Sequence, residues 1–234
     1  DSAAQVKDLL GPGTKPDAIE AMKQLISRAK NAGLSPEQAA EAARSGRERE
    51  AAALYARYQQ RLSAFNAVDF DDLIRLPVQL LETDTDAVMG WRERIGYLLV
   101  DECQDTNDAQ YRLMKAIAGE KGNFTCVGDD DQSIYAWRGA NPENLSQLGK
   151  DYPALRIVKL EQNYRCSNRV LRAANALIAN NPHEHPKKLW SQQADGERIR
   201  ILEGRDNEHE AERIAAEIQF LNASRQAAWH EFCI

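Results

Sequence analysis

The sequence predicts an α/β protein, and two patterns in the order of its residues carry this prediction. Apolar residues recur at spacings of three and four through the first third of the chain, which is the period of an amphipathic helix. Beyond Asp71, short β-like runs alternate with helical segments, as they do in an α/β domain. With 234 residues, 28% of them charged and 43% hydrophobic, the chain can form one large or two small globular domains.

Two helices are indicated in the first third of the chain. The first has Pro16 near its start and Gly33 just past its end, which is the usual placement of these two residue types around a helix. The second begins at Ser35, because Ser35 and Gln38 form an S-x-x-Q capping box. Alanine-rich sequence then continues this second helix to about Phe65.

Five short runs are predicted to be β-strands, each bounded by turn-forming residues. An amphipathic helix from about Asn207 to Leu221 is expected between the last two runs. The five runs are residues 97–100, 124–127, 156–160, 199–202 and 232–234. Because the chain stops on an apolar residue inside a predicted strand, we expect it to be part of a longer protein.

Composition and charge exclude several classes of protein. No apolar stretch reaches the roughly 20 residues of a membrane span, and no signal peptide is apparent, so we expect a soluble intracellular protein with no membrane partner. The net charge of −6 argues against coating nucleic acid by bulk positive charge, so any such contact must be local. The four cysteines form no C-x-x-C pair, which favours reduced thiols over a zinc knuckle or a disulfide framework.

Two adjacent carboxylates, Asp101 and Glu102, close the first predicted strand. In nucleotide hydrolases, an aspartate at such a strand end holds Mg²⁺, and a neighbouring acid can position the attacking water. An ordinary turn at the end of a strand would have the same residues. The pair therefore leaves both interpretations open.

A second polar segment, residues 128–140, follows the next predicted strand. Tyr135 and Trp137 could stack on bases, which is worth ~1–3 kcal/mol per base. Gln132 and Arg138 could contact phosphate, so this one segment could touch both a nucleotide and a nucleic-acid strand. The alternative is that the aromatic rings pack in the core beside a solvated acidic turn.

A third pair of candidate residues, Tyr164 and Arg165, follows the run at 156–160. Tyr164 can stack on a base, and Arg165 can neutralise phosphate charge in the manner of an arginine finger. The alternative is a buried tyrosine beside an arginine in a structural ion pair.

Taken in order, these segments resemble the superfamily-one DNA helicases of the UvrD/Rep/PcrA type, and most of all their Rep branch. The resemblance rests on D-E-C-Q-D-T from Asp101, G-D-D-D-Q-S-I-Y-A-W-R-G-A from Gly128 and Q-N-Y-R-C-S from Gln162. The segment Asp69–Ile74 is also similar to that family, and the resemblance covers essentially the whole chain.

This resemblance implies a fold and an activity. The fold would consist of RecA-like P-loop NTPase lobes, and the activity would couple ATP hydrolysis, with Mg²⁺, to 3′ to 5′ movement along single-stranded DNA. The substrates would be single-stranded and forked DNA, and the partners would be replication or repair proteins. The protein would work in the bacterial cytoplasm, in association with the nucleoid.

The resemblance also implies catalytic roles for four residues of the first lobe. Asp101 would coordinate Mg²⁺, and Glu102 would activate the water that attacks the γ-phosphate of ATP. Gln132 would sense that phosphate, and Arg138 would contact it.

Four aromatic and basic residues acquire roles by the same resemblance. Tyr135 and Trp137 would contact the bases of single-stranded DNA and so couple hydrolysis to movement. Tyr164 would stack on adenine, and Arg165 would reach the γ-phosphate from the second lobe.

The resemblance divides the chain into three parts and identifies a missing one. Residues 1–68 would belong to an inserted helical subdomain, 69–150 to the rest of the first lobe and 151–234 to the start of the second. No segment of the sequence matches G-x-x-x-x-G-K-[ST], the loop that cradles the phosphates. We therefore expect an internal fragment that has little activity by itself.

Two other functions remain open. One is a non-catalytic DNA-binding or scaffold protein that kept the helicase lobe without its phosphate loop. The other is a metal-dependent nuclease that uses Asp101, Glu102 and Asp129 to Asp131 as ligands of two metal ions. The nuclease would leave the segment from Gln132 to Ala140 without a role.

Overall fold

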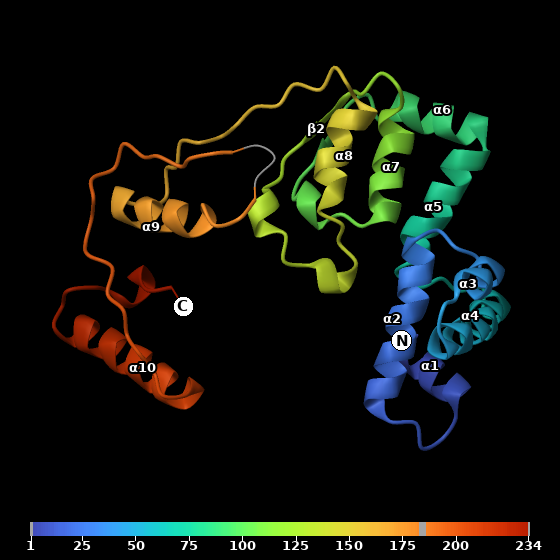
Figure 1. Cartoon of the computed structure of the whole chain (residues 1–234), viewed down its shortest axis with the longest axis horizontal. Coiled ribbons are helices and arrows are strands. Elements are labelled where there is room, and N and C mark those ends of the chain that lie inside the picture. The colour runs from blue at the N-terminus through green and yellow to red at the C-terminus, as the bar shows by residue number, and fades with distance from the viewer. Residues whose placement is uncertain (1, 183–185, 234) are drawn as a thin grey trace. The chain divides into compact units, whose positions relative to one another are not determined.

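The computed structural model describes residues 2–182 and 186–233, without the side chain of Arg138. The chain divides into two units, residues 1–157 and 158–234. Figure 1 shows the course of the chain from its first helix to its last. No helix within the described ranges has the length and apolar character that a membrane span requires.

Four helices at the start of the first unit pack around one apolar core (Figure 1). They are α1 (Ser2–Leu10), α2 (Pro16–Asn31), α3 (Pro36–Ala42) and α4 (Gly46–Ala64). Helix α2 confirms the first predicted helix, since it begins at Pro16 and is followed by Gly33 in the left-handed region with φ +74°. The core of this bundle consists of Val6, Met22, Ile26, Ala51, Leu54, Tyr55, Tyr58 and Leu62.

The predicted capping box at Ser35 is present, but the long helix expected after it is interrupted. Gln38 N donates to Ser35 Oγ at 3.2 Å, and Ser35 N donates to Gln38 Oε1 at 2.8 Å. Helix α3 then ends at Ala42, and a second capping box, between Ser45 and Glu48, begins α4. Alanine propensity favours a continuous helix, but Ser45 and Glu48 bond the free backbone donors of a new helix start and so fix the break.

The rest of the first unit is an α/β arrangement built on two parallel strands. Strand β1 (Leu98–Val100) pairs with β2 (Phe124–Cys126), which confirms the first two predicted strands. Helix α7 (Asp108–Ala118) connects them, and it packs with α8 (Glu143–Asp151) over a second apolar core. Helices α5 (Asp72–Thr83) and α6 (Thr85–Arg94) lie between the bundle and β1 in sequence. Because parallel strands end at the same edge, the segments that follow β1 and β2 lie together there.

The described part of the second unit contains helices but none of the strands expected in it. Helix α10 (Asn207–Ala223) confirms the predicted helix, and α9 (Asn168–Ile178) precedes it. The predicted strands at 156–160, 199–202 and 232–233 are wrong, and Ile234 lies outside the described residues. Extended backbone becomes a strand only when a neighbour pairs with it, whereas Leu160 is 77% and Ile201 92% exposed. In the described residues of this unit, strand-type pairing is limited to one isolated parallel bridge between Gln162 and Trp190.

A buried ion-pair network joins the helical bundle to the start of α5. Lys30 Nζ, on α2, lies 2.8 Å from Asp69 Oδ2 and 2.9 Å from Asp72 Oδ2. The hydroxyl of Tyr58 donates to Asp69 at 3.0 Å, and Arg75 pairs with Asp72 at 3.1 Å. The side chains of Lys30 and Asp72 are both 0% exposed. This network fixes the segment 69–72 against α2 and α4.

A shorter relay connects the same bundle to α7. Asn31 Nδ2 donates to Asp71 Oδ1 at 3.2 Å, and Asn107 Nδ2 donates to Asn31 Oδ1 at 3.0 Å. Asn107 is also the N-cap of α7, since its Oδ1 accepts from Gln110 N at 2.9 Å. The relay therefore anchors the chain just after the carboxylate pair at 101–102.

Candidate functional site

The acid loop, residues 101–106, begins where β1 ends. Asp101 and Glu102 are both exposed, and Asp101 Oδ1 accepts from the backbone N–H of Glu102 at 3.0 Å. Glu102 has the left-handed backbone angles φ +50° and ψ +45°, which a non-glycine residue seldom adopts. Strained conformations of this kind persist where the surroundings hold them, and they gather at functional sites.

Hydrogen bonds hold the acid loop to two neighbouring parts of the chain. The backbone N–H of Cys103 donates to Val127 O at 2.9 Å, which ties the loop to the end of β2. Thr106 accepts the backbone N–H of Asn141 at 2.9 Å and the side-chain amide of Asn144 at 3.0 Å, both at its carbonyl oxygen. The loop is therefore fixed to the neighbouring strand and to the start of α8.

The second loop, residues 128–133, lies beside the acid loop at the same edge of the sheet. Gln132 Nε2 donates to Asp129 Oδ2 at 2.7 Å, and the backbone N–H of Asp129 donates to Gln104 Oε1 at 3.0 Å. Gln104 Nε2 in turn donates to Glu102 Oε2 at 2.8 Å. The structure thus brings Glu102 and Gln132 into one hydrogen-bonded chain.

Sequence reasoning assigned no role to Gln104, although it is the link between the two loops. The signal that could have found it is its position inside D-E-C-Q-D-T, two residues after Glu102. At this distance a long amide side chain can turn back to the carboxylate. The sequence could not show the hydrogen bond between Gln104 and Asp129, because the two residues are 25 positions apart in the chain.

The aromatic pair of the second segment faces away from the core. Tyr135 is 38% and Trp137 is 70% exposed, so the alternative in which both rings pack in the core is wrong. The two ring centroids are 6.4 Å apart, with the planes inclined by 45°. The side chain of Arg138, the fourth predicted residue of this segment, lies outside the described part of the structure.

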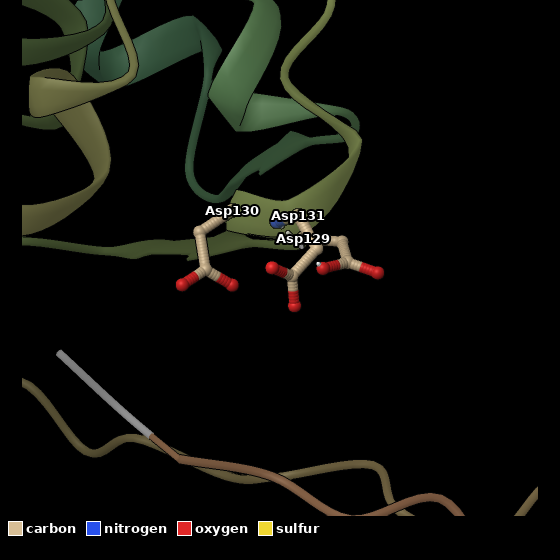
Figure 2. Close-up of side chains that lie close together, drawn as sticks. All are labelled: Asp129, Asp130 and Asp131. Carbon is tan, nitrogen blue, oxygen red and sulfur yellow. Dashed lines mark hydrogen bonds between the residues drawn. The ribbon is translucent and has the colours of Figure 1, made fainter. Parts of the chain in front are cut away.

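Three carboxylates cluster in the second loop. Asp129, Asp130 and Asp131 have oxygen atoms within 4.8 Å of one another, and Figure 2 shows the three side chains on the same side of the ribbon. Asp101 and Glu102 do not belong to this cluster among the described residues.

The second unit carries the remaining predicted residues, Tyr164 and Arg165. Asn163 Oδ1 accepts the backbone N–H groups of Arg165 at 3.0 Å and of Cys166 at 2.7 Å, which forms a tight turn around both residues. Gln193 Nε2 donates to Tyr164 O at 2.7 Å. Tyr164 is 77% exposed, so the alternative of a buried tyrosine is wrong. The turn leaves the side chains of both Tyr164 and Arg165 exposed.

Two family models match consecutive parts of the chain. Residues 2–153 match the UvrD/REP helicase N-terminal domain. Residues 158–234 match the UvrD-like helicase C-terminal domain.

Curated relatives cover most of this chain. The ATP-dependent DNA helicases Rep of Salmonella typhimurium and of Escherichia coli are each 48% identical to it over 221 residues. The ATP-dependent DNA helicase PcrA of Leuconostoc citreum is 41% identical over 210 residues. The matched segment is 93% of this chain but 33% of either Rep protein, and 90% of this chain but 28% of the PcrA protein. The chain thus spans about a third of the length of the Rep relatives.

Proposed function

Because the chain belongs to the UvrD/Rep helicase family, we propose that the whole protein is a DNA helicase that couples ATP hydrolysis to 3′ to 5′ movement on single-stranded DNA. Its substrates are single-stranded and forked DNA in bacterial replication or repair, in association with the nucleoid. The observation that carries the proposal is the hydrogen-bonded chain from Glu102 through Gln104 and Asp129 to Gln132. It joins a candidate general base to the segment that bears Tyr135 and Trp137.

The acid loop and the second loop supply the hydrolytic chemistry in this proposal. Glu102 accepts a proton from the water that attacks the γ-phosphate, a role that suits an exposed carboxylate at a strand end. Gln132 and Arg138 contact that phosphate, and Gln132 senses whether it is still present. Tyr164 stacks on adenine, and Arg165 stabilises the charge that develops on the γ-phosphate.

The donor set at the end of β1 fits a hard divalent cation. Asp101 offers carboxylate oxygens on an exposed side chain, and oxygen donors of this kind are what Mg²⁺ prefers. Asp101 is therefore the residue that would hold Mg²⁺. When bound, the ion neutralises charge on the phosphates of ATP.

We propose that the first unit is part of a RecA-like lobe and that its sheet is completed by other parts of the whole protein. Parallel sheets are normally covered on both faces and contain more than two strands. Here Leu99, in β1, is 76% exposed and Val127, just past β2, is 50% exposed. The two separate apolar cores support a division near residue 68 between a helical subdomain and this lobe. Residues 151–234 would begin the second lobe.

The experiment that tests the proposal uses the full-length protein that contains this chain. ATP hydrolysis is measured with and without single-stranded DNA, in the presence of Mg²⁺, and strand separation is measured on forks with a 3′ or a 5′ single-stranded arm. We expect hydrolysis that DNA stimulates and unwinding that requires the 3′ arm. Hydrolysis that ignores DNA, or unwinding from the 5′ arm alone, would contradict the proposal.

Replacing Trp137 with alanine is expected to weaken binding of single-stranded DNA by the full-length protein. The loss of one stacked base is worth ~1–3 kcal/mol, or roughly 5- to 150-fold in Kd. Fluorescence anisotropy of a labelled oligonucleotide measures this change. Trp91→Ala is the matched control, because Trp91 is also exposed, at 44%, but lies on α6. An unchanged Kd for Trp137→Ala would remove this residue from the DNA path.

A second candidate function is a non-catalytic DNA-binding protein derived from a helicase lobe. These 234 residues contain no G-x-x-x-x-G-K-[ST] segment, and whether the whole protein contains one distinguishes this candidate from an active helicase. The same assays distinguish the two candidates. DNA binding without ATP hydrolysis by the full-length protein would favour the second.

A further inference from the structure

The side chain of Gln104 lies buried between the acid loop and the second loop. The residue is 1% exposed, and both ends of its amide are engaged. Its Nε2 donates to Glu102 Oε2 at 2.8 Å, and its Oε1 accepts from the backbone N–H of Asp129 at 3.0 Å. Its backbone carbonyl also accepts from Ser133 Oγ at 3.5 Å. One residue therefore contacts the candidate base and both ends of the η2 turn (Asp130–Gln132).

These contacts require an amide at position 104. The ionised carboxylate of Glu102 can only accept a hydrogen bond, and the backbone N–H of Asp129 can only donate one. The bridging side chain must therefore offer one donor and one acceptor, and it must be long enough to reach both loops. Glutamine meets these requirements. Glutamate would bring a second carboxylate against Glu102, and leucine would offer neither group.

The second loop approaches this bridge closely at Gly128. A Cβ atom on Gly128 would lie 2.9 Å from Gln104 Oε1, 3.2 Å from Leu145 Cδ1 and 3.4 Å from Cys103 Cβ. The first distance is shorter than carbon and oxygen tolerate without a shift. Glycine at 128 thus allows the second loop to approach the amide closely.

Glu102 depends on this bridge for its orientation. Its backbone is in the strained left-handed region, and its side chain is exposed, so the carboxylate has few other contacts that would fix it. The hydrogen bond from Gln104 is charge-assisted and comes from a buried group, which makes it stronger than a neutral pair at the surface. Gln104 is held in turn by the second loop. A shift of that loop would therefore move the donor that orients Glu102.

We propose that Gln104 is a positioning residue that ties the orientation of the Glu102 carboxylate to the position of the second loop, so that DNA contact at Tyr135 and Trp137 sets the rate of ATP hydrolysis. This inference rests on the proposed function and deepens it. Gln104 itself touches neither the reacting phosphate nor the DNA. Its effect is on turnover rather than on the binding of either ligand.

Gln104→Leu and Gly128→Ala test this inference in the full-length protein from two sides. The first variant removes both hydrogen bonds, and the second pushes the amide with a methyl group while leaving Gln104 in place. The rate of ATP hydrolysis is measured over a range of ATP concentrations, without DNA and at saturating single-stranded DNA. The Kd for single-stranded DNA and the thermal melting of each variant are measured alongside.

We expect both variants to lower kcat at saturating DNA by about 10²-fold, because misplacing a catalytic group by a small distance costs about that much. The KM for ATP and the Kd for DNA should stay within about twofold, because neither ligand contacts Gln104, and the DNA stimulation of kcat should fall. Gln60→Leu is the matched control, since Gln60 is exposed on α4, and it should behave as the wild type.

Wild-type kcat in both Gln104→Leu and Gly128→Ala would overturn the inference while leaving the helicase proposal intact. A parallel loss of kcat, ATP affinity and melting temperature in both variants would also overturn it, because it would assign Gln104 a structural role only. If the wild-type protein shows no DNA-stimulated hydrolysis at all, the proposed function fails and this inference fails with it. The wild-type assay therefore separates the two failures.

Discussion

Glu102→Gln in the full-length protein is expected to lower kcat for ATP hydrolysis by roughly 10²- to 10⁴-fold, the usual contribution of a general base. The amide has the shape of the carboxylate and keeps an oxygen that can accept from Gln104 Nε2, so the acid loop should retain its conformation. It cannot take a proton from the attacking water. ATP and DNA should therefore still bind while turnover is lost.

The measurement is the steady-state hydrolysis rate at saturating DNA, with nucleotide and oligonucleotide affinities determined in parallel. Glu120→Gln is the matched control, because Glu120 is an exposed acid in the turn that precedes β2. It should leave kcat unchanged. A Glu102→Gln protein that retains wild-type kcat would show that another group activates the water.

Lys30→Met is expected to destabilise the helical bundle by about 3–5 kcal/mol, the usual result of removing one partner of a buried ion pair. Lys30 Nζ lies within 2.9 Å of two carboxylates and 5.1 Å from the centroid of the Tyr58 ring. Without the ammonium group, Asp69 and Asp72 would face each other as buried charges. Arg75 would remain as the partner of Asp72.

Hydrogen exchange of the backbone amides in α2, α4 and α5 measures this loss in the full-length protein, because it reports local opening separately from the other domains. Lys23→Met is the matched control in the same helix. Lys23 pairs with Glu20 at 3.1 Å on the surface, where such a pair contributes ~0–1 kcal/mol. Equal protection in Lys30→Met and Lys23→Met would contradict the assigned role of the network.

The same network gives the bundle a dependence on pH. Burial by itself would raise the pKa of Asp72, but hydrogen bonds and charges from Lys30 and Arg75 hold that pKa below its usual value. A carboxyl group whose pKa is lower in the folded state stabilises the fold above its unfolded pKa of ~3.9. This contribution is lost as the pH falls through the folded pKa. In Lys30→Met, the acid-dependent loss of protection between those two values should be smaller than in the wild type.

The sequence predicted the features that depend on near neighbours in the chain. The start of α3 follows from Ser35 and Gln38, which bond each other across three residues. The two strands before the acid loop and the second loop follow from apolar runs bounded by turns. The order of D-E-C-Q-D-T and G-D-D-D-Q-S-I-Y-A-W-R-G-A was specific enough to identify the family. Ser45 and Glu48 carry the same kind of local signal for the start of α4, within alanine-rich sequence that favours one continuous helix.

The predictions that failed concern features that need contacts far apart along the chain, which a local run of residues cannot specify. The runs at 156–160 and 199–202 have strand-like composition, yet neither is a strand in the described residues. A strand needs a neighbouring strand to pair with, and composition does not show whether one is present. The exposure of Trp137 and Tyr164 likewise could not be read from sequence, since both interpretations of each residue fit the same letters.

By itself, then, the sequence determined the family, the positions of the candidate catalytic residues and the starts of α2 and α3, because these depend on residue types at fixed short spacings. Only the tertiary structure decided that Lys30 is the buried partner of Asp69 and Asp72, 39 and 42 residues away, and that Gln104 joins Glu102 to Asp129, 25 residues further along. The physical reason is that a buried polar group must find a partner wherever packing brings one, and that choice is made in space rather than along the chain.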